Sequence, residues 1–180
     1  MAYESPEYEV ERRLGPVEIR RYAPYVVAET LVGGSLEGAG NGAVRRLAGY
    51  IFGGNETADG GSTKIALPTP VPQERVGDGF RVRFMMPSSN ELEALPTPSD
   101  ERVRLDRVGA RRLAAIRYSG RWSSDGYERH LARLDEVLAE HGVATTGEPI
   151  WARYDPPWKP WFLRRNEVLV PVDEQPGEAT

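Results

Sequence analysis

The segment from Tyr154 to Val168 carries side chains that are suited to holding a flat ligand. Its sequence, YDPPWKPWFLRRNEV, places four aromatic rings and three basic residues among three prolines. Ring faces stack on planar molecules, and Lys or Arg side chains pair with carboxylates. The prolines exclude a regular interior strand. We predict a pocket for a planar, partly anionic ligand, and packing onto the core stays open as the alternative. The residues concerned are Tyr154, Trp158, Lys159, Trp161, Phe162 and Arg164.

A second apolar and basic group ends the first predicted helix. Two methionines close a later predicted strand, and methionine side chains adapt to the shape of a ligand. Part of this group must belong to the core. The residues are Arg45, Arg46, Leu47, Tyr50, Ile51 and Phe52, with Met85 and Met86 on the strand.

The two histidines fall on one predicted helix but cannot share a metal ion. His130 and His141 are eleven residues apart, which separates them by about 16 Å along a helix axis. Both project on the apolar arc of the helix, where a partly buried, hydrogen-bonded histidine is the ordinary outcome. The chain has no cysteine, which excludes thiolate catalysis and cysteine-ligated zinc. We predict no metal site.

Carboxylates for acid–base chemistry are present, and Glu167 stands out because it directly follows the aromatic segment. A general acid or base is one interpretation. An ion pair with Arg164 or Arg165 at a strand edge is the alternative that we favour. No Ser or Thr has the context of an activated nucleophile, so Glu167 is the one speculative catalytic residue. The other carboxylates considered are Glu29, Glu93 and Glu148.

The glycine-rich run GAGNGA, residues 38–43, matches a dinucleotide-binding pattern in letters but not in context. Residues 33–37 separate it from the preceding strand, and the next extended segment is too rich in proline for a buried parallel strand. We predict instead a helix whose small residues allow close packing of its backbone.

The N-terminal half is predicted to contain strands and one helix. Residues 17–32 have the alternation and β-branched content of a strand, with a bend at Pro24. Ser35 is a good N-cap for a helix that ends at residues 53–55. The segment KIALPTPVPQERV is expected at a sheet edge or as an irregular strand. DGFRVRFMMP is predicted to be a strand with one face formed by Phe80, Val82 and Phe84.

The C-terminal half repeats this order of elements. Residues 103–120 align without a gap on residues 17–34, and a helix and two extended segments follow. We therefore predict a single α+β domain over residues 1–175. Its repeat halves are expected at about 8–90 and 100–172, with a disordered tail at 173–180.

Composition narrows the class of protein. The 180 residues suffice for one well-cored domain, and the net charge of −4 does not favour polyanions, so we expect no nucleic-acid partner. The N-terminus lacks an apolar stretch of signal-peptide length, and no window approaches the roughly 20 apolar residues of a membrane span. We expect a soluble, cytoplasmic protein.

Several segments, in this order, resemble the SOUL haem-binding family. They are YEVERR with EIRRYAPYVVAET, RRLAGYIFGGN, KIALPTPV, VRFMMPSS, LPTPSDERVRL and YDPPWKPWFLRRNEVLVPV. Together they cover about residues 8–172. One departure is LPTPV at residues 67–71, where the family usually has Met-Thr-Ala-Pro-Val, so a ligand contact made by that methionine is not carried over.

The resemblance implies two β–α–β–β repeats that form a distorted β-barrel flanked by two helices, related to GyrI-like effector-binding domains. It also implies binding of haem or another tetrapyrrole in a shallow apolar groove beside the first helix and the loop before the last strand. Carried over by position, the groove residues are Leu47, Tyr50, Ile51, Phe52, Tyr154, Trp158, Trp161 and Phe162. The expected propionate contacts are Arg45, Arg46, Lys159 and Arg164.

A carrier or buffer of tetrapyrroles, rather than an enzyme, is the function that these observations favour. No axial histidine motif is evident, so stacking and charge would hold the porphyrin. Two alternatives remain: a hydrolase or modifier of hydrophobic small molecules, and a module that binds another protein through its tryptophans.

Overall fold

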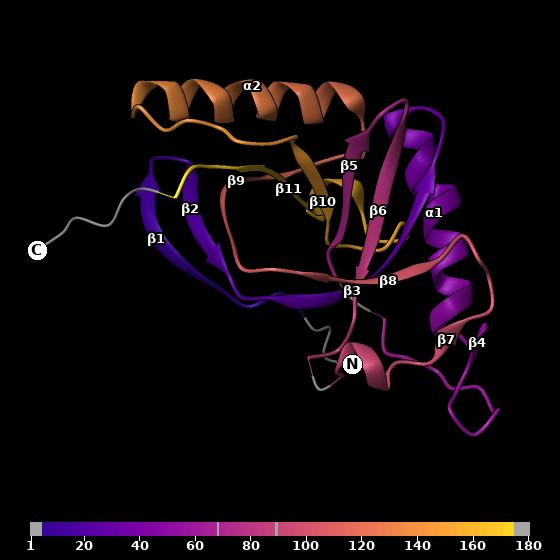
Figure 1. Cartoon of the computed structure of the whole chain (residues 1–180). Helices are drawn as coiled ribbons and strands as arrows, with labels where there is room; N and C mark the ends of the chain where they lie inside the picture. The colour runs from indigo at the N-terminus through magenta and orange to yellow at the C-terminus, as the bar shows by residue number, and fades with distance from the viewer. Residues whose placement is uncertain (1–4, 68, 89, 175–180) are drawn as a thin grey trace, which may run out of the picture.

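One antiparallel sheet of nine strands curls into a half-barrel, and two helices pack on its outer face (Figure 1). The computed structural model describes residues 5–67, 69–88 and 90–174. The elements of the first half are β1 (Tyr8–Leu14), β2 (Val17–Tyr22), β3 (Tyr25–Val32), α1 (Leu36–Ile51), β4 (Asn55–Glu56), β5 (Val71–Val76) and β6 (Gly79–Met85). Those of the second half are η1 (Leu92–Ala94), β7 (Thr97–Pro98), β8 (Arg104–Val108), β9 (Arg111–Ser119), α2 (Ser124–Glu140), β10 (Ile150–Arg153), η2 (Trp161–Leu163) and β11 (Arg165–Pro171).

The strand order shows the internal repeat directly. It runs β1-β2-β9-β11-β10-β5-β6-β3-β8, so β10-β11-β9 on one side of the centre match β5-β6-β3 on the other. Each triplet is extended at its outer side by a strand from the other half of the chain: β2 pairs with β9, and β8 pairs with β3. The predicted α+β class with two similar halves is confirmed, and the halves exchange β2 and β8.

Each helix covers its own half of the sheet. Helix α1 packs on β3 and β6, and α2 packs on β9 and β11. Leu47 and Ile51 of α1, and Leu134 of α2, are completely buried in two separate clusters. A third cluster, which includes Leu113, Ile150 and Leu169, lies on the other face, inside the curl.

Local sequence signals account for most of the elements. The predicted bend at Pro24 separates β2 from β3. The side chain of Ser35 caps α1 by accepting a hydrogen bond from the backbone nitrogen of Gly38 at 3.0 Å, as predicted. Strand β6 buries the expected face of Phe80, Val82 and Phe84.

Two strands differ from expectation. The proline-bearing strand β5 is not at an edge but lies in the middle of the sheet, between β10 and β6. Its Pro72 falls beyond the last β5–β6 pair, Gln73 with Val82, so the missing N–H does not interrupt that ladder. Strand β1 was not predicted, because it is an edge strand in which only Leu14 is buried and the exposed side chains, except Val10, are polar or aromatic.

Asp173 and Glu174, the last two residues that the structure describes, are bonded to arginines of the sheet. The guanidinium of Arg112 donates to the carbonyl of Asp173, and Arg21 pairs with Glu174 at 2.8 Å. The remainder of the predicted disordered tail, residues 175–180, lies outside the described residues. Across the ranges that the structure describes, no helix is long and apolar enough to cross a membrane.

Candidate functional site

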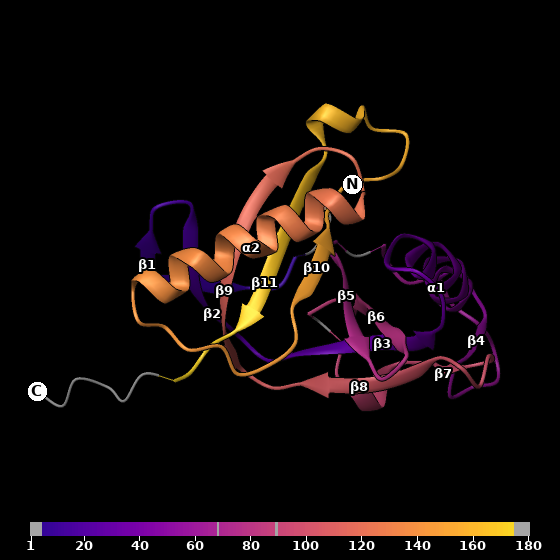
Figure 2. The same ribbon diagram turned by 90° about the horizontal axis from the view of Figure 1, so that it is seen from above.

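The loop between β10 and β11, residues 154–164, projects beyond the ends of both strands (Figure 2). We call it the aromatic loop. Its Arg164 side chain turns inward and donates to the carbonyls of Lys159, at 2.9 Å, and Pro157. Asp155 accepts from Lys159 at 2.7 Å and from the backbone nitrogen of Arg165 at 2.6 Å. These bonds brace the loop from within, so two of the cations predicted to contact propionates, Lys159 and Arg164, already have partners.

The apolar side chains of the aromatic loop face outward instead. Trp158 is 80% exposed, Phe162 is 58% exposed and Trp161 is 46% exposed. The rings of Trp161 and Phe162 meet edge to face with centroids 5.7 Å apart. These three rings are therefore not part of the core. Tyr154, by contrast, points into the half-barrel.

Next to this loop, Arg153 at the end of β10 is a buried cation with no carboxylate partner in the described parts of the chain. It is only 6% exposed, and its Nη2 has no hydrogen-bond partner among the described residues. Its guanidinium carbon lies 5.1 Å from the ring centre of Trp122 and 5.3 Å from that of Trp151. Burial lowers the pKa of Arg153 to about 10, so it remains charged at neutral pH. A buried, unpaired charge is costly, and an anionic group brought beside it would relieve that cost.

Helix α1 closes over this cation at Gly40. A Cβ atom at Gly40 would lie 1.9 Å from Nη2 of Arg153 and 2.9 Å from Oε1 of Gln73. That Gln73 oxygen is likewise buried without a hydrogen-bond partner, while its Nε2 donates to the carbonyl of Leu36 at 2.7 Å. The small residue in the GAGNGA run thus permits a close backbone approach, as predicted, and what it accommodates is the side chain of Arg153.

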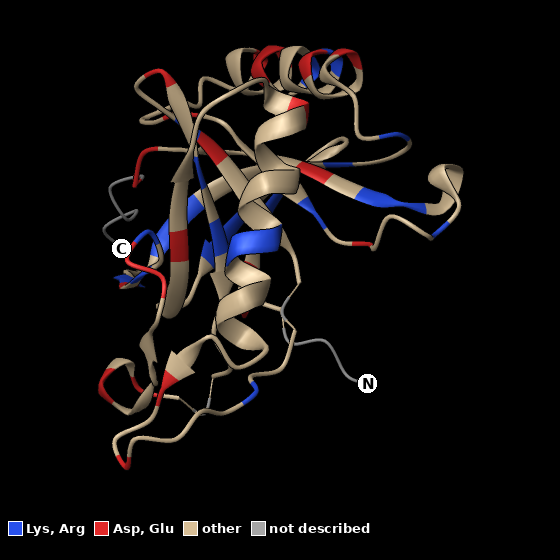
Figure 3. Ribbon diagram, turned by 90° about the vertical axis from the view of Figure 1, so that its right-hand side faces the viewer, with Lys and Arg blue, Asp and Glu red and all other residues tan. Residues whose placement is uncertain are grey.

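Trp122 connects Arg153 to the aromatic loop. Arg164 of that loop also lies over the Trp122 ring, with its guanidinium carbon 4.6 Å from the ring centre. Trp122 is therefore shared by Arg153 and Arg164. We call Arg153, Trp122, Arg164 and the rings of the aromatic loop the aromatic–cation site. Figure 3 shows the aromatic loop standing out to one side of α1.

The predicted residues of α1 are placed differently from one another. Leu47, Tyr50 and Ile51 are at most 2% exposed and pack against the sheet. Tyr50 donates to the carbonyl of Pro96 at 2.8 Å, and burial raises its pKa to about 12. Leu47 and Ile51 pack between the helix and the sheet, and direct contact of either with a ligand would require the helix to move. Phe52 is 59% exposed at the end of α1.

The basic rim predicted on α1 borders a separate hollow of about 700 Å³. Arg45 and Arg46 line it together with Tyr50 and residues 99–102, and no residue of the aromatic loop does. Arg46 is engaged with Thr30, at 2.7 Å to its Oγ1, and with the carbonyl of Leu31 at 3.1 Å. The structure therefore does not bring this rim and the aromatic loop together around one cavity.

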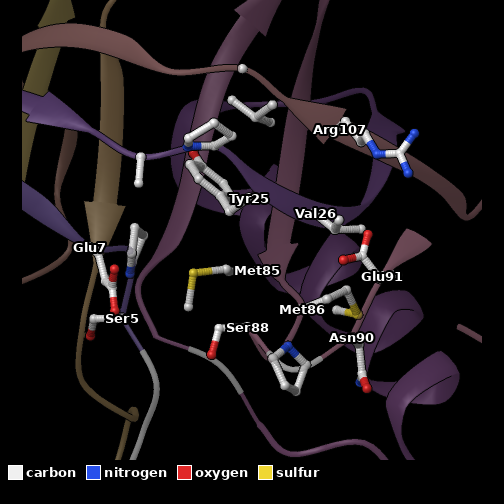
Figure 4. Close-up of a pocket in the computed structure, with 16 residues that line it drawn as sticks. Ser5, Glu7, Tyr25, Val26, Met85, Met86, Ser88, Asn90, Glu91 and Arg107 are labelled. Atoms are coloured by element: carbon white, nitrogen blue, oxygen red, sulfur yellow. The ribbon is translucent and has the colours of Figure 1, made fainter. Parts of the chain in front are cut away.

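Met85 lines another cavity, of about 630 Å³, where the N-terminal segment crosses the start of β3 (Figure 4). Its walls include Tyr25 and Met86, and the carboxylates of Glu7 and Glu91 lie at its border. Arg107 also lines it, but Glu93 accepts from the same Nη2 of Arg107 at 2.7 and 2.8 Å. The charge around this cavity is therefore unfavourable for an anionic ligand.

Glu167 lies inside the curl in a central strand rather than at a strand edge. It is completely buried and accepts from Nη1 and Nη2 of Arg20 at 2.8 and 2.9 Å. It also accepts from Arg165 at 2.8 Å and from the hydroxyl of Tyr154 at 2.8 Å. Burial alone would raise the pKa of Glu167, but the hydrogen bonds and charge of Arg20 and Arg165 outweigh it, so the pKa is lowered. The carboxylate is held ionised, and four donors occupy its oxygens.

The histidines have the structural partners that were expected. Nδ1 of His130 lies 2.7 Å from the carbonyl of Gly126, and its ring stacks on Tyr118 at 3.8 Å. Nδ1 of His141 lies 2.8 Å from the carbonyl of Val137. Within the described residues, no three His, Asp or Glu side chains are grouped so that they could hold a metal ion.

Sequence reasoning missed Arg153, Trp122 and Arg20. Arg153 and Trp122 are separated by a whole helix in the chain, and Arg20 pairs with Glu167 across 147 positions. One usable signal existed: Arg153 follows the apolar residues IWA of β10, with Trp151 on the same face, and a charged residue on a buried strand face demands a partner.

Comparison with known proteins gives one clear relationship in sequence and several in fold. The profile of the family described as "SOUL heme-binding protein" matches residues 3–171. "Heme-binding protein 1" of Xenopus tropicalis is 28% identical over 155 residues, which span 84% of this chain and 80% of that protein.

The related structures are distant in sequence. A structure titled as a hydrolase from Listeria innocua superposes with a TM-score of 0.65 at 15% identity, over 87% of this chain and 91% of that one. The C-terminal domain of EcmrR superposes with a TM-score of 0.61 at 9% identity, over 93% and 98% of the two chains. At these identities the likeness shows the fold alone, and it is consistent with the predicted relation to GyrI-like effector-binding domains. The match to the family profile over nearly the whole chain shows that this protein belongs to the SOUL heme-binding protein family.

Proposed function

We propose that this protein reversibly binds haem or a related tetrapyrrole at the aromatic–cation site, as a carrier or buffer. The observation that carries the proposal is Arg153, a buried cation without a carboxylate, between Trp122 and Trp151 and beside the aromatic loop. A propionate of the ligand is the anion that would complete this site. The family membership makes a porphyrin the ligand of first choice.

The neighbouring side chains suit the remainder of such a ligand. Trp161, Trp158 and Phe162 offer exposed ring faces at the edge of the site, and porphyrins present large flat faces to stack on them. The internal hydrogen bonds of Arg164 and Asp155 hold the loop in shape before binding, which limits the ordering cost. The loop rings lie at the surface, so a ligand stacked on them could leave again, as a carrier or buffer requires.

The other two hollows are weaker candidates for a dicarboxylate. The cavity at Met85 has Glu7 and Glu91 at its border, and the Arg107 charge there is already neutralised. The hollow at Arg45 also contains Asp100 and Glu101 in its lining, and Asp100 is paired with Arg102 at 2.7 Å. Only at Arg153 is a buried cation left without a partner among the described residues.

The test is a titration of wild-type protein and Arg153→Met with haemin and with protoporphyrin IX, followed by the Soret band and by tryptophan quenching. We expect the variant to bind both ligands at least about tenfold more weakly, because a charge-assisted pair in a desolvated site is lost. The iron-free ligand should respond like haemin, since the contact is to the propionates.

Two matched controls separate this site from the other hollows. Arg45→Met removes a cation at the α1 hollow, and Arg107→Met removes one at the Met85 cavity. Both should bind porphyrin within about twofold of wild type, a difference too small to represent a lost charge-assisted bond. Wild-type affinity in a folded Arg153→Met variant would overturn the proposed site, and a loss confined to Arg45→Met would move it to α1.

An enzymatic function receives no support from Glu167. Its oxygens accept from Arg20, Arg165 and Tyr154, and its pKa is lowered rather than raised towards neutrality. A general base needs a free lone pair within reach of a substrate. We therefore keep Glu167 as a structural residue and place the hydrolase and protein-binding alternatives behind tetrapyrrole binding.

A further inference from the structure

Four large apolar side chains are gathered at the end of the aromatic loop. Trp158 is 80% exposed, Phe162 58%, Leu163 55% and Trp161 46%. We call these four residues the apolar tip. The other exposed large hydrophobic residues in the described parts of the chain are scattered over β1, β3, α1 and the segment before β5. Isolated exposed apolar residues are normal, whereas a contiguous group marks a surface that binds something.

The loop is built so that these side chains cannot fold back onto the body. Prolines flank Trp158 and precede Trp161. The polar groups of the loop bond inward, Arg164 to two carbonyls of the loop and Asp155 to Lys159 and to the backbone of Arg165. The prolines and these bonds restrict the loop, which stands beyond the ends of β10 and β11 (Figure 2).

Positive charge lies directly behind the apolar tip. The guanidinium carbon of Arg121, an exposed residue, is 4.7 Å from the ring centre of Trp161. Lys159 and Arg164 add two more cations, against the single carboxylate of Asp155. The chain as a whole carries a net charge of −4. The apolar tip thus coincides with a local excess of positive charge in a protein that is acidic as a whole.

We propose that the apolar tip docks this protein on anionic phospholipid bilayers. Tryptophan and arginine both place an apolar body next to a polar or charged group, which suits the headgroup region of a membrane. Phe162 and Leu163 would enter the acyl boundary, while Arg121 meets acidic headgroups. Exposed apolar side chains with cations beside them match the layers of an anionic bilayer, in which acyl chains lie beneath acidic headgroups.

The proposal does not depend on porphyrin binding. Docking would nevertheless place the aromatic–cation site beside the bilayer, where lipophilic porphyrins dissolve. The test therefore uses the protein without ligand and vesicles without porphyrin, so that the two proposals can fail separately.

The experiment is co-sedimentation with vesicles of phosphatidylcholine alone and of phosphatidylcholine with phosphatidylserine. Wild-type protein should bind the vesicles that contain phosphatidylserine, less so as salt is raised, and should show a blue shift of tryptophan emission. Leu163→Asp places a charge in the apolar tip and should weaken binding at least about tenfold. Arg121→Gln should weaken binding and reduce its dependence on salt.

The matched control is Leu31→Asp, because Leu31 is 58% exposed on β3 and lies outside the loop. This variant should bind vesicles like wild type. Arg153→Met should also bind vesicles like wild type, even where it has lost porphyrin affinity. Absence of wild-type binding to anionic vesicles, or equal binding by Leu163→Asp and Leu31→Asp, would overturn the proposal. Capture of a protein through the apolar tip without any vesicle binding would do so as well.

Discussion

At the residue scale, the ion pair of Arg20 and Glu167 is the interaction most sensitive to a single change. Both side chains are at most 3% exposed, and two hydrogen bonds of 2.8 and 2.9 Å join them. Tyr22 and Tyr154 add hydrogen bonds to the same pair, to Arg20 at 2.9 Å and to Glu167 at 2.8 Å. Replacing one partner of such a pair leaves the other charge buried alone, which is more costly than the pair is worth.

Glu167→Gln is therefore expected to lower the free energy of unfolding by about 3 kcal/mol or more, measured by urea denaturation at neutral pH. The matched control, Glu93→Gln, removes an exposed partner of Arg107 and should change the midpoint little. An effect of Glu167→Gln as small as that of the control would mean that the pair does not hold the half-barrel together.

The same residue gives stability a dependence on pH. The pKa of Glu167 is lower in the folded protein than in the unfolded chain. Its contribution is therefore complete above the unfolded pKa, near 4.3, and is lost as the pH falls through the folded pKa below that value. Unfolding measured from pH 7 down to pH 3 should show this loss in wild type and a flatter profile in Glu167→Gln.

At the scale of elements, the contact between α1 and β10 depends on the absence of a side chain at Gly40. A Cβ there would lie 1.9 Å from Nη2 of Arg153, whose guanidinium has Trp122 and Trp151 beside it and little room to retreat. Gly42, two residues along the same helix, has nothing within 4 Å of its Cβ position. The two glycines form a matched pair.

Gly40→Ala should lower the free energy of unfolding by about 1–3 kcal/mol through overpacking and should also weaken porphyrin binding by displacing Arg153. Gly42→Ala should raise the free energy of unfolding by about 0.5–1 kcal/mol, because alanine is the better helix former. Thermal denaturation of both variants tests this. Equal effects of the two substitutions would contradict the close approach at Gly40.

Sequence patterns predicted elements well where the determinants are local. Ser35 caps the start of α1, and the alternation of Phe80, Val82 and Phe84 marks β6, and both signals involve residues close together in the sequence. The position of β5 could not be predicted that way, because Pro72 is tolerated only through the register of β5 against β6. The candidate site was predicted in part: the aromatic loop was found, whereas Arg153 gains its environment from Gly40, Gln73 and Trp122, which meet only in the folded chain.

At the scale of the whole molecule, neither half of the chain contains all of its own sheet. Strand β2 finds its second neighbour in β9, and β3 finds one in β8. The helices also meet across the halves, since the carboxylate of Glu37 on α1 accepts from the backbone nitrogen of Ser124 on α2 at 2.7 Å. The two repeats therefore depend on each other for folding.

Fragments 1–90 and 91–180, produced separately, should each lack a cooperative unfolding transition and the dispersed amide signals of a folded domain. Mixing the fragments should restore the cooperative transition and the dispersed signals, because fragment 1–90 supplies β2 to β9 and fragment 91–180 supplies β8 to β3. A single fragment with a folded spectrum would show that strand exchange is not required.

The exchange of β2 and β8 also has a consequence for the history of the chain. A protein made of only one repeat would leave the sites for these strands open, and a second copy would have to fill them, as in a strand-swapped dimer. Joining two copies in one polypeptide raises the effective concentration of the partner strands to the millimolar range. Assembly then no longer depends on how much protein the cell contains, and the two copies are free to diverge, one keeping the apolar tip and the other the cavity at Met85.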